Sequence, residues 1–168
     1  MRYFRRAMIG WMMLCGTVAL ADEISPVTLD PITHQRASLR LDNGTQQVTL
    51  SPAELEELET YRISTSTPWR AIAADFDGVL LRDVLALNDM QDLDAIRVLA
   101  ENDYAVEIPN WVWRTHLVLI ATRVDGAPHK RRERGPLQFV MLHDAYTNDP
   151  AMSEGYWVWM AAAIEPVE

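Results

Sequence analysis

Positive side chains are concentrated in one short segment of this sequence. Four of the chain's 15 lysine and arginine residues lie in the run 129–134. The pair Asp125-Gly126 precedes this run and Gly135-Pro136 follows it, which predicts a loop between the apolar segments 117–120 and 137–142. Clustered donors on a loop suit an anionic or carbonyl-rich ligand. A solvated loop whose charges answer nearby acidic residues explains the same composition equally well.

Arg123 stands at the end of a predicted buried strand. A charged side chain at such a place needs an ion-pair partner or a ligand, because burying an unpaired charge is costly.

The segment 65–69 offers a different chemistry. It places hydroxyl groups, including those of Ser66 and Thr67, beside the indole of Trp69 and just past a strand end. An indole can stack on a flat heteroaromatic ring while hydroxyls bond the ring's edge. The alternative is that Trp69 fills the edge of the core and the hydroxyls cap turns.

Asn102, Asp103 and Tyr104 form a third candidate group beside a strand. A carboxylate recognises an amino-pyrimidine edge by accepting from its N–H groups. The Asn-Asp pair is also an ordinary turn sequence, so both interpretations stay open.

Other site chemistry is not indicated. The four histidines have no metal-ligand spacing, and no Ser-His-Asp order, glycine-rich phosphate loop or paired-carboxylate motif is present. The only cysteine is Cys15. Four tryptophans form two Trp-x-Trp pairs, which are typical of a core or a protein interface; they are Trp111, Trp113, Trp157 and Trp159.

The first residues have the pattern of a secretory signal peptide. Three arginines precede an apolar stretch over 7–18, and Ala19-Leu20-Ala21 is a small-x-small cleavage site. Cleavage after residue 21 removes Cys15 and leaves 12 lysines and arginines against 24 acidic residues, a net charge of −12 instead of −9. We therefore expect an exported, periplasmic protein that binds no nucleic acid and has no direct membrane insertion after cleavage.

The rest of the chain predicts one β-rich α+β domain over 37–168, preceded by an extended arm over 22–36. A hairpin is expected around Asn43-Gly44, and Ser51 with Glu54 predicts a helix with a capping box that ends near residue 59. Strands are predicted over 61–65, 95–100, 104–108, 117–122 and 139–142. Residues 73–81, with Asp77-Gly78 at their centre, are expected to form a turn that feeds a helix. A short connection should contain Trp111 and Trp113, and a last strand or short helix is expected over 156–164.

Six segments in this order carry a family resemblance. They are 49–55 (TLSPAEL), 64–69 (STSTPW), 76–85 (FDGVLLRDVL), 100–109 (AENDYAVEIP), 120–126 (IATRVDG) and 132–137 (RERGPL). Together they resemble the small exported proteins with a sulfite-oxidase-like molybdopterin-binding fold. The resemblance runs from about residue 49 to the C-terminus.

The resemblance implies a pterin-sized pocket and a set of contacts to it. Trp69 would stack on the ring, with Ser66 and Thr67 nearby. Asn102, Asp103 and Tyr104 would line the ring, with Asp103 accepting from the amino-pyrimidine edge, while Arg123 and Arg134 would donate to carbonyl and side-chain oxygens. Large enzymes of this superfamily bind molybdenum through a cysteine, and serine or threonine occupies the comparable place here. We therefore expect a reduced pterin as ligand without molybdenum.

The leading hypothesis is a non-catalytic periplasmic pterin-binding protein. The resemblance implies that it regulates a membrane-anchored cyclic-di-GMP synthase or phosphodiesterase through the periplasmic sensing domain of that enzyme. The alternatives are a molybdopterin-dependent oxidoreductase subunit and a ligand-free domain that only binds protein.

Overall fold

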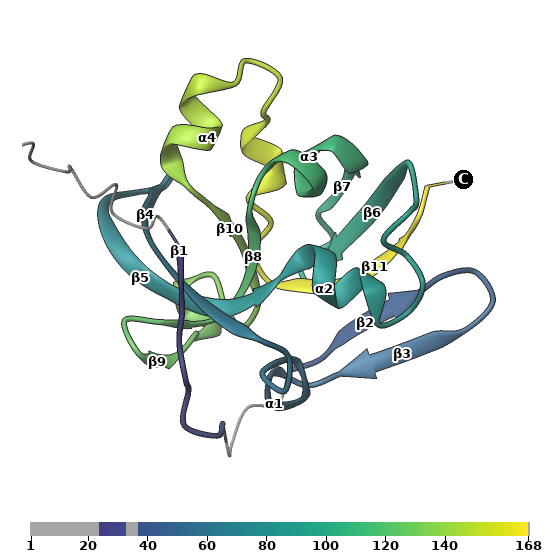
Figure 1. The fold of residues 1–168 in the computed structure, drawn as a ribbon, viewed down its shortest axis with the longest axis horizontal. Helices are drawn as coiled ribbons and strands as arrows, with labels where there is room; N and C mark the ends of the chain where they lie inside the picture. The colour runs from purple at the N-terminus through teal and green to yellow at the C-terminus, as the bar shows by residue number, and fades with distance from the viewer. Residues whose placement is uncertain (1–23, 33–36, 168) are drawn as a thin grey trace, which may run out of the picture.

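The computed structural model describes residues 24–32 and 37–167. The strands form two sheets, joined into one mixed α+β domain dominated by strands (Figure 1). The coarse fold class expected from the sequence is therefore confirmed. The predicted signal peptide over 1–21 lies outside the described residues. In the described part of the chain, no helix is long and apolar enough to span a membrane.

The first sheet has the strand order β1-β4-β5-β8-β10, with β9 added beside β8. All of its pairings are antiparallel. Its strands are β1 (Ile24–Pro26), β4 (Thr60–Thr67), β5 (Arg70–Leu80), β8 (Val118–Val124), β9 (Ala127–Pro128) and β10 (Gln138–Met141). β1 is part of the expected extended arm, and its pairing with β4 attaches the arm to the sheet.

The second sheet has the order β3-β2-β11-β6-β7. β2 and β11 are parallel, and the other neighbours are antiparallel. The strands are β2 (Leu39–Asp42), β3 (Gln47–Leu50), β6 (Ala95–Ala100), β7 (Ala105–Pro109) and β11 (Ala161–Pro166). The hairpin predicted around Asn43-Gly44 is confirmed as β2–β3, and Gly44 adopts the positive φ that such a turn favours.

Short helices connect these strands. They are α1 (Pro52–Leu55), α2 (Leu81–Ala86), α3 (Asn110–Thr115) and α4 (His143–Asn148), with 3-10 turns η1 (Arg131–Glu133) and η2 (Glu154–Tyr156). The predicted capping box is present, because the Ser51 side chain accepts from the backbone of Glu54 and the Glu54 carboxylate accepts from the backbone N–H of Ser51. α1 is shorter than predicted. The short connection expected at Trp111 and Trp113 is the helix α3, which joins β7 to β8.

The predicted turn at Asp77-Gly78 is also wrong. These residues lie inside β5, where the pairing with β8 shifts register between them. A Cβ on Gly78 would stand 2.1 Å from the carbonyl oxygen of Ile120 on β8. Glycine is therefore required for the close approach of two strands, not for a change of chain direction.

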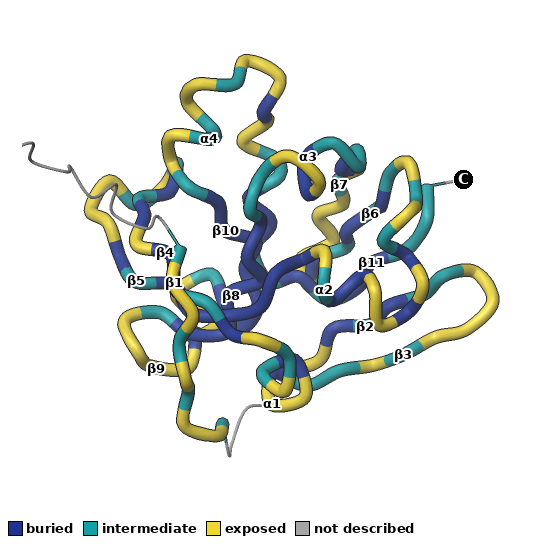
Figure 2. Tube along the Cα trace, in the orientation of Figure 1, coloured by how far each residue is buried: buried dark blue, intermediate teal, exposed yellow. Residues whose placement is uncertain are grey.

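The core lies where the two sheets meet. Buried residues follow β8, β10 and the second half of β5, while exposed residues gather at the hairpin ends (Figure 2). α2 packs against β5, β8 and α3, filling the space beside the first sheet. The predicted central strands at 117–122 and 139–142 are confirmed as β8 and β10, which are buried along almost their whole length.

Candidate functional site

Trp69 lies in the tight turn between β4 and β5, with 37% of its surface exposed. Its indole stacks on that of Trp159, with 5.6 Å between the ring centroids and 19° between the planes. Trp159 comes from the far end of the chain, just before β11, and bridges to Gln138 of β10. The turn of one sheet and the entry to a strand of the other thus form one aromatic pair.

Arg134 lies at the edge of this aromatic pair. Its guanidinium carbon is 5.0 Å from the centroid of Trp159 and 5.6 Å from that of Trp69, within cation–π range of both rings. Arg134 follows η1 in the left-handed conformation, with φ of 76°. Its carbonyl oxygen accepts from the backbone N–H of Met160 at 3.1 Å, which holds the end of the loop beside the strand that follows Trp159.

Two cavities meet at Trp69. The first, of about 280 Å³, combines charged, polar and aromatic side chains and carries more basic than acidic groups. Besides Trp69 it is lined by Thr67, Arg70, Phe76, His129, Arg132, Glu133, Arg134 and Gln138. The second, of about 410 Å³, is more apolar and is lined by Asn102, Tyr104, Glu154, Trp157 and Trp159. Each is near the lower end of the range of about 300–1,000 Å³ that is typical of small-molecule sites.

The cations around the first cavity differ in their partners. Arg70 pairs with Asp125 at 3.1 Å, and Arg132 pairs with Glu133 at 3.3 Å. Arg131, in the same predicted cationic loop, pairs instead with Glu101 at the end of β6. The side chain of Arg134 has no hydrogen bond or ion pair to any residue of the ranges 24–32 and 37–167, and its buried Nε is unsatisfied. Of these four arginines, it is the one whose donors are still available for a ligand.

His129 supplies a neutral wall to the first cavity. It is almost fully buried, and its Nε2 lies 2.9 Å from Oε1 of Gln138. Burial lowers the pKa of His129, with the hydrogen bond to Gln138 acting in the opposite direction. The imidazole is therefore uncharged near neutral pH, and the positive character of this cavity comes from arginine alone.

One side of the second cavity is formed by a turn of the second sheet. Asn102 and Tyr104 belong to the connection between β6 and β7, and the Tyr104 hydroxyl donates to the carbonyl oxygen of Gly155 at 3.2 Å. Burial and the nearby carboxylate of Glu154 raise the pKa of Tyr104, so the phenol keeps its proton. Because its one proton goes to Gly155, the Tyr104 hydroxyl offers a ligand only acceptor lone pairs, beside the apolar surface of its ring.

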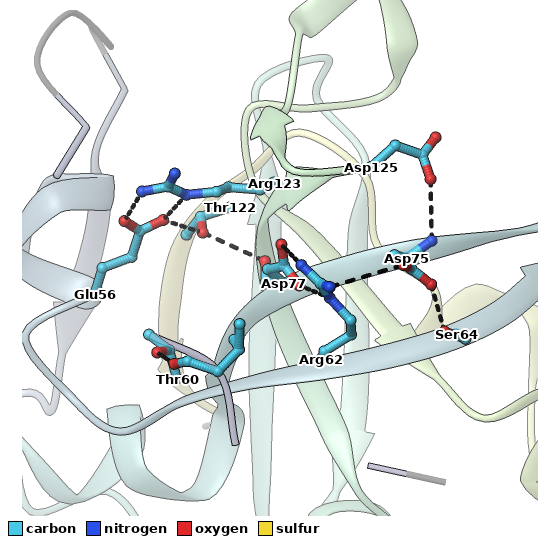
Figure 3. Close-up of polar contacts among 10 residues, drawn as sticks. Glu56, Thr60, Arg62, Ser64, Asp75, Asp77, Thr122, Arg123 and Asp125 are labelled. Carbon is cyan, nitrogen blue, oxygen red and sulfur yellow. Dashed lines mark hydrogen bonds and ion pairs between the residues drawn. The ribbon is translucent and has the colours of Figure 1, made fainter. Parts of the chain in front are cut away.

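Arg123 has a different environment from the one expected of a ligand contact. Its Nε and one terminal nitrogen bind both carboxylate oxygens of Glu56 at 3.0 and 2.6 Å (Figure 3). The same terminal nitrogen also donates to the carbonyl oxygen of Asp30. Both side chains of the ion pair are more than 90% buried. This pairing raises the pKa of Arg123. Arg123 lines neither of the cavities at Trp69.

Arg123 belongs to a row of charges across the first sheet (Figure 3). Asp77 on β5 is opposite both Arg123 on β8 and Arg62 on β4 in the strand register. Arg62 binds the fully buried carboxylate of Asp77 through two hydrogen bonds of 2.6 and 3.0 Å. Thr122 donates to Glu56 at 2.5 Å. The row attaches α1 and the N-terminal arm to the sheet, which is a structural role.

The structure thus brings five of the eight predicted site residues to the two cavities and leaves three outside them. Thr67, Trp69, Asn102, Tyr104 and Arg134 line the cavities. Ser66, Asp103 and Arg123 do not. Asp103 occupies the β6–β7 turn in the left-handed region, with φ of 64°, and is exposed. Its backbone geometry is that of an ordinary turn residue.

Trp159 is the main site residue that the sequence did not identify. Its Trp-x-Trp pairing with Trp157 was interpreted as core or interface, and both residues in fact line the apolar cavity. The signal was present in the spacing, because alternate residues of an extended segment share one face. The other pair, Trp111 and Trp113, lies in α3 and takes no part in these cavities.

Within the described ranges, no group of three or more histidine, cysteine, aspartate or glutamate side chains is arranged to hold a metal ion. A comparison with protein-family models found no match, and no curated protein matches this sequence.

Proposed function

We propose that this protein is a periplasmic, non-catalytic pterin-binding protein. In this proposal it regulates a membrane-anchored cyclic-di-GMP synthase or phosphodiesterase through the periplasmic sensing domain of that enzyme. The observation that carries the ligand assignment is the convergence of Thr67, Trp69, Asn102, Tyr104 and Arg134 on two cavities that share one indole. The location and the partner come from the leader-like N-terminus and the family resemblance of the sequence.

The chemistry of the site suits a flat ring with polar edges. Trp69 and Trp159 provide aromatic faces for stacking, and Arg134 provides unpaired donors for a carbonyl or ring nitrogen. Asn102 offers both a donor and acceptors on the opposite side, and the Tyr104 ring adds apolar surface. A pterin, which has a planar bicyclic core with a carbonyl and an amino group on its rim, matches these groups.

A molybdenum centre does not fit the donor set. The segment comparable to the molybdenum-binding loop holds hydroxyls, and two of them are already engaged. Ser64 donates to Asp75, and the Thr65 hydroxyl accepts from the backbone N–H of His143 at 2.9 Å. Soft metals of this kind are held by thiolate, which hydroxyls do not replace. We therefore favour a binding protein over a molybdopterin-dependent oxidoreductase subunit.

The proposal is tested on protein isolated from the periplasm. We expect the protein to release a fluorescent oxidised pterin on denaturation in about stoichiometric amount, and to contain no molybdenum by metal analysis. Trp69→Ala should lose the pterin, while Trp111→Phe, which changes an indole outside the cavities, should keep it. Stoichiometric molybdenum with dye-linked reductase activity would refute the proposal and establish the oxidoreductase alternative. A wild-type protein that carries no pterin would also refute it and would favour the alternative of a ligand-free domain that only binds protein.

A further inference from the structure

The Trp69–Trp159 stack poses a spatial problem for any flat ligand. Two parallel rings with a third ring between them need about 7 Å between their planes, since carbon contacts are about 3.5 Å or more. The indole centroids are 5.6 Å apart, so no ring fits between them in this arrangement. Each indole covers part of the face that its neighbour would offer to a ligand.

The two indoles differ in how firmly their backbone segments are held. Trp159 lies in a segment fixed on both sides by backbone hydrogen bonds. Phe139 donates to the carbonyl of Val158 at 2.7 Å, and Met160 both donates to Arg134 and accepts from Glu101. Trp69 lies in the two-residue tip of the β4–β5 hairpin, beyond the Thr67–Arg70 pair that closes it, and the following residues, 71–73, are exposed. The indole of Trp69 is therefore the wall that can move, and that of Trp159 is the fixed wall.

Arg134 lies where it could bind the edge of a ring held between the two indoles. Its guanidinium lies close to both indoles, and its donors have no partner among the residues described. In the closed pair, cation–π contact with the two indoles is the only interaction that this side chain makes among the described residues. A ring that enters between the indoles brings an acceptor edge to the guanidinium, which replaces cation–π contact with hydrogen bonds.

We propose that Trp69 and Trp159 form a closed aromatic slot that opens by displacement of the β4–β5 hairpin tip and takes a flat bicyclic heteroaromatic ring between the two indoles, with its acceptor edge on Arg134. This inference rests on the proposed function for the identity of the ring, and it adds Trp159 as a binding residue. It also links occupancy to the exposed hairpin tip, which carries Ile72 at 80% exposure.

Stacked indoles provide a direct readout of this slot. Two indoles this close couple electronically and give a pair of bands of opposite sign in the far-ultraviolet circular dichroism spectrum. We expect the free protein to show this couplet, and both Trp69→Leu and Trp159→Leu to remove it equally. Trp111→Phe is the matched control, because Trp111 contacts His116 edge-on outside the slot. A free protein without the couplet overturns the inference.

Ligand binding is tested with three compounds that carry flat bicyclic or larger rings. They are 6-hydroxymethylpterin, its 7,8-dihydro form, and riboflavin. Binding is measured by ligand or tryptophan fluorescence, and the couplet is recorded at each addition. We expect the couplet to disappear in proportion to occupancy. Each leucine variant should weaken binding about tenfold or more, in line with the strength of aromatic stacking on bases. Trp111→Phe should bind as the wild type does.

The outcomes separate this inference from the proposed function. A pterin that binds without changing the couplet overturns the slot and leaves the pterin assignment standing. Riboflavin that removes the couplet while neither pterin binds supports the slot and refutes the pterin assignment. If no ring of the three binds or alters the couplet at millimolar concentration, the slot itself is refuted.

Discussion

The buried ion pair between Glu56 and Arg123 gives a sharp test of which arginines belong to the ligand site. Glu56→Gln removes the charge with little change in shape and leaves the guanidinium of Arg123 buried without its counter-ion. The two side chains are only 6% and 8% exposed and are joined at 2.6 and 3.0 Å. Breaking one partner of such a buried pair costs about 3–5 kcal/mol.

The expected loss of stability is large enough for a simple assay. For a domain of this size, a loss of about 3–5 kcal/mol corresponds to a fall in Tm of roughly 6–20 °C. Thermal and urea denaturation of Glu56→Gln, Arg123→Met and the double variant would measure both the single effects and their coupling. We expect the double variant to lose less than the sum of the single losses, because the residues share one interaction.

An exposed ion pair supplies the matched control. Arg114 and Asp92 are 3.4 Å apart and 48% and 84% exposed, so Arg114→Met should cost at most about 1 kcal/mol. The folded Arg123→Met variant should bind pterin as well as the wild type, because Arg123 lines neither cavity at Trp69. Our reasoning would be refuted if Arg123→Met kept its stability and lost the ligand.

Three further predictions concern the scaffold. Gly78→Ala should cost about 3 kcal/mol in urea denaturation, the upper end of the usual cost of overpacking, since its new Cβ would collide with the Ile120 carbonyl; a clearly smaller loss would show that β5 and β8 can separate there. Ser51→Ala should cost about 1 kcal/mol through loss of the α1 cap, and an unchanged unfolding midpoint would contradict this. Because burial lowers the pKa of His129, the unfolded chain takes up a proton near pH 6.5 before the folded one does, so the free energy of unfolding should fall as the pH drops below about 6.5. His129→Gln should flatten that fall between pH 7.5 and 5.5, and an equally steep fall in the variant would assign it to other groups.

Local signals in the sequence were predictive. The β2–β3 hairpin and the Ser51 capping box were both found because turn and cap chemistry depend on residues within a few positions of each other. The same local logic failed at Gly78. An Asp-Gly pair is a strong turn signal, but the reason for this glycine is the approach of β8, more than 40 positions away.

The candidate site shows the same difference between features set by nearby residues and features set by long-range contacts. Trp69 could be singled out from its segment and Arg134 through the family resemblance, and both line the cavities. The stacking of Trp69 on Trp159 joins positions 90 residues apart, and the pairing of Arg123 with Glu56 joins positions 67 residues apart. The sequence predicted that Arg123 needed a partner or a ligand, because a buried charge must be compensated. It could not choose between the two, because that choice depends on tertiary packing.

The ion pair between Arg131 and Glu101 has a consequence for how the domain holds together. It connects the loop after β9, in the first sheet, to the end of β6, in the second, beside the aromatic pair that joins the same two sheets. A ring held by Trp69 from one sheet and Trp159 from the other would act as a cross-link at this seam. Such a molecule would do more than occupy a cavity: it would make the two sheets open together instead of separately, so that local opening at the seam becomes linked to ligand concentration.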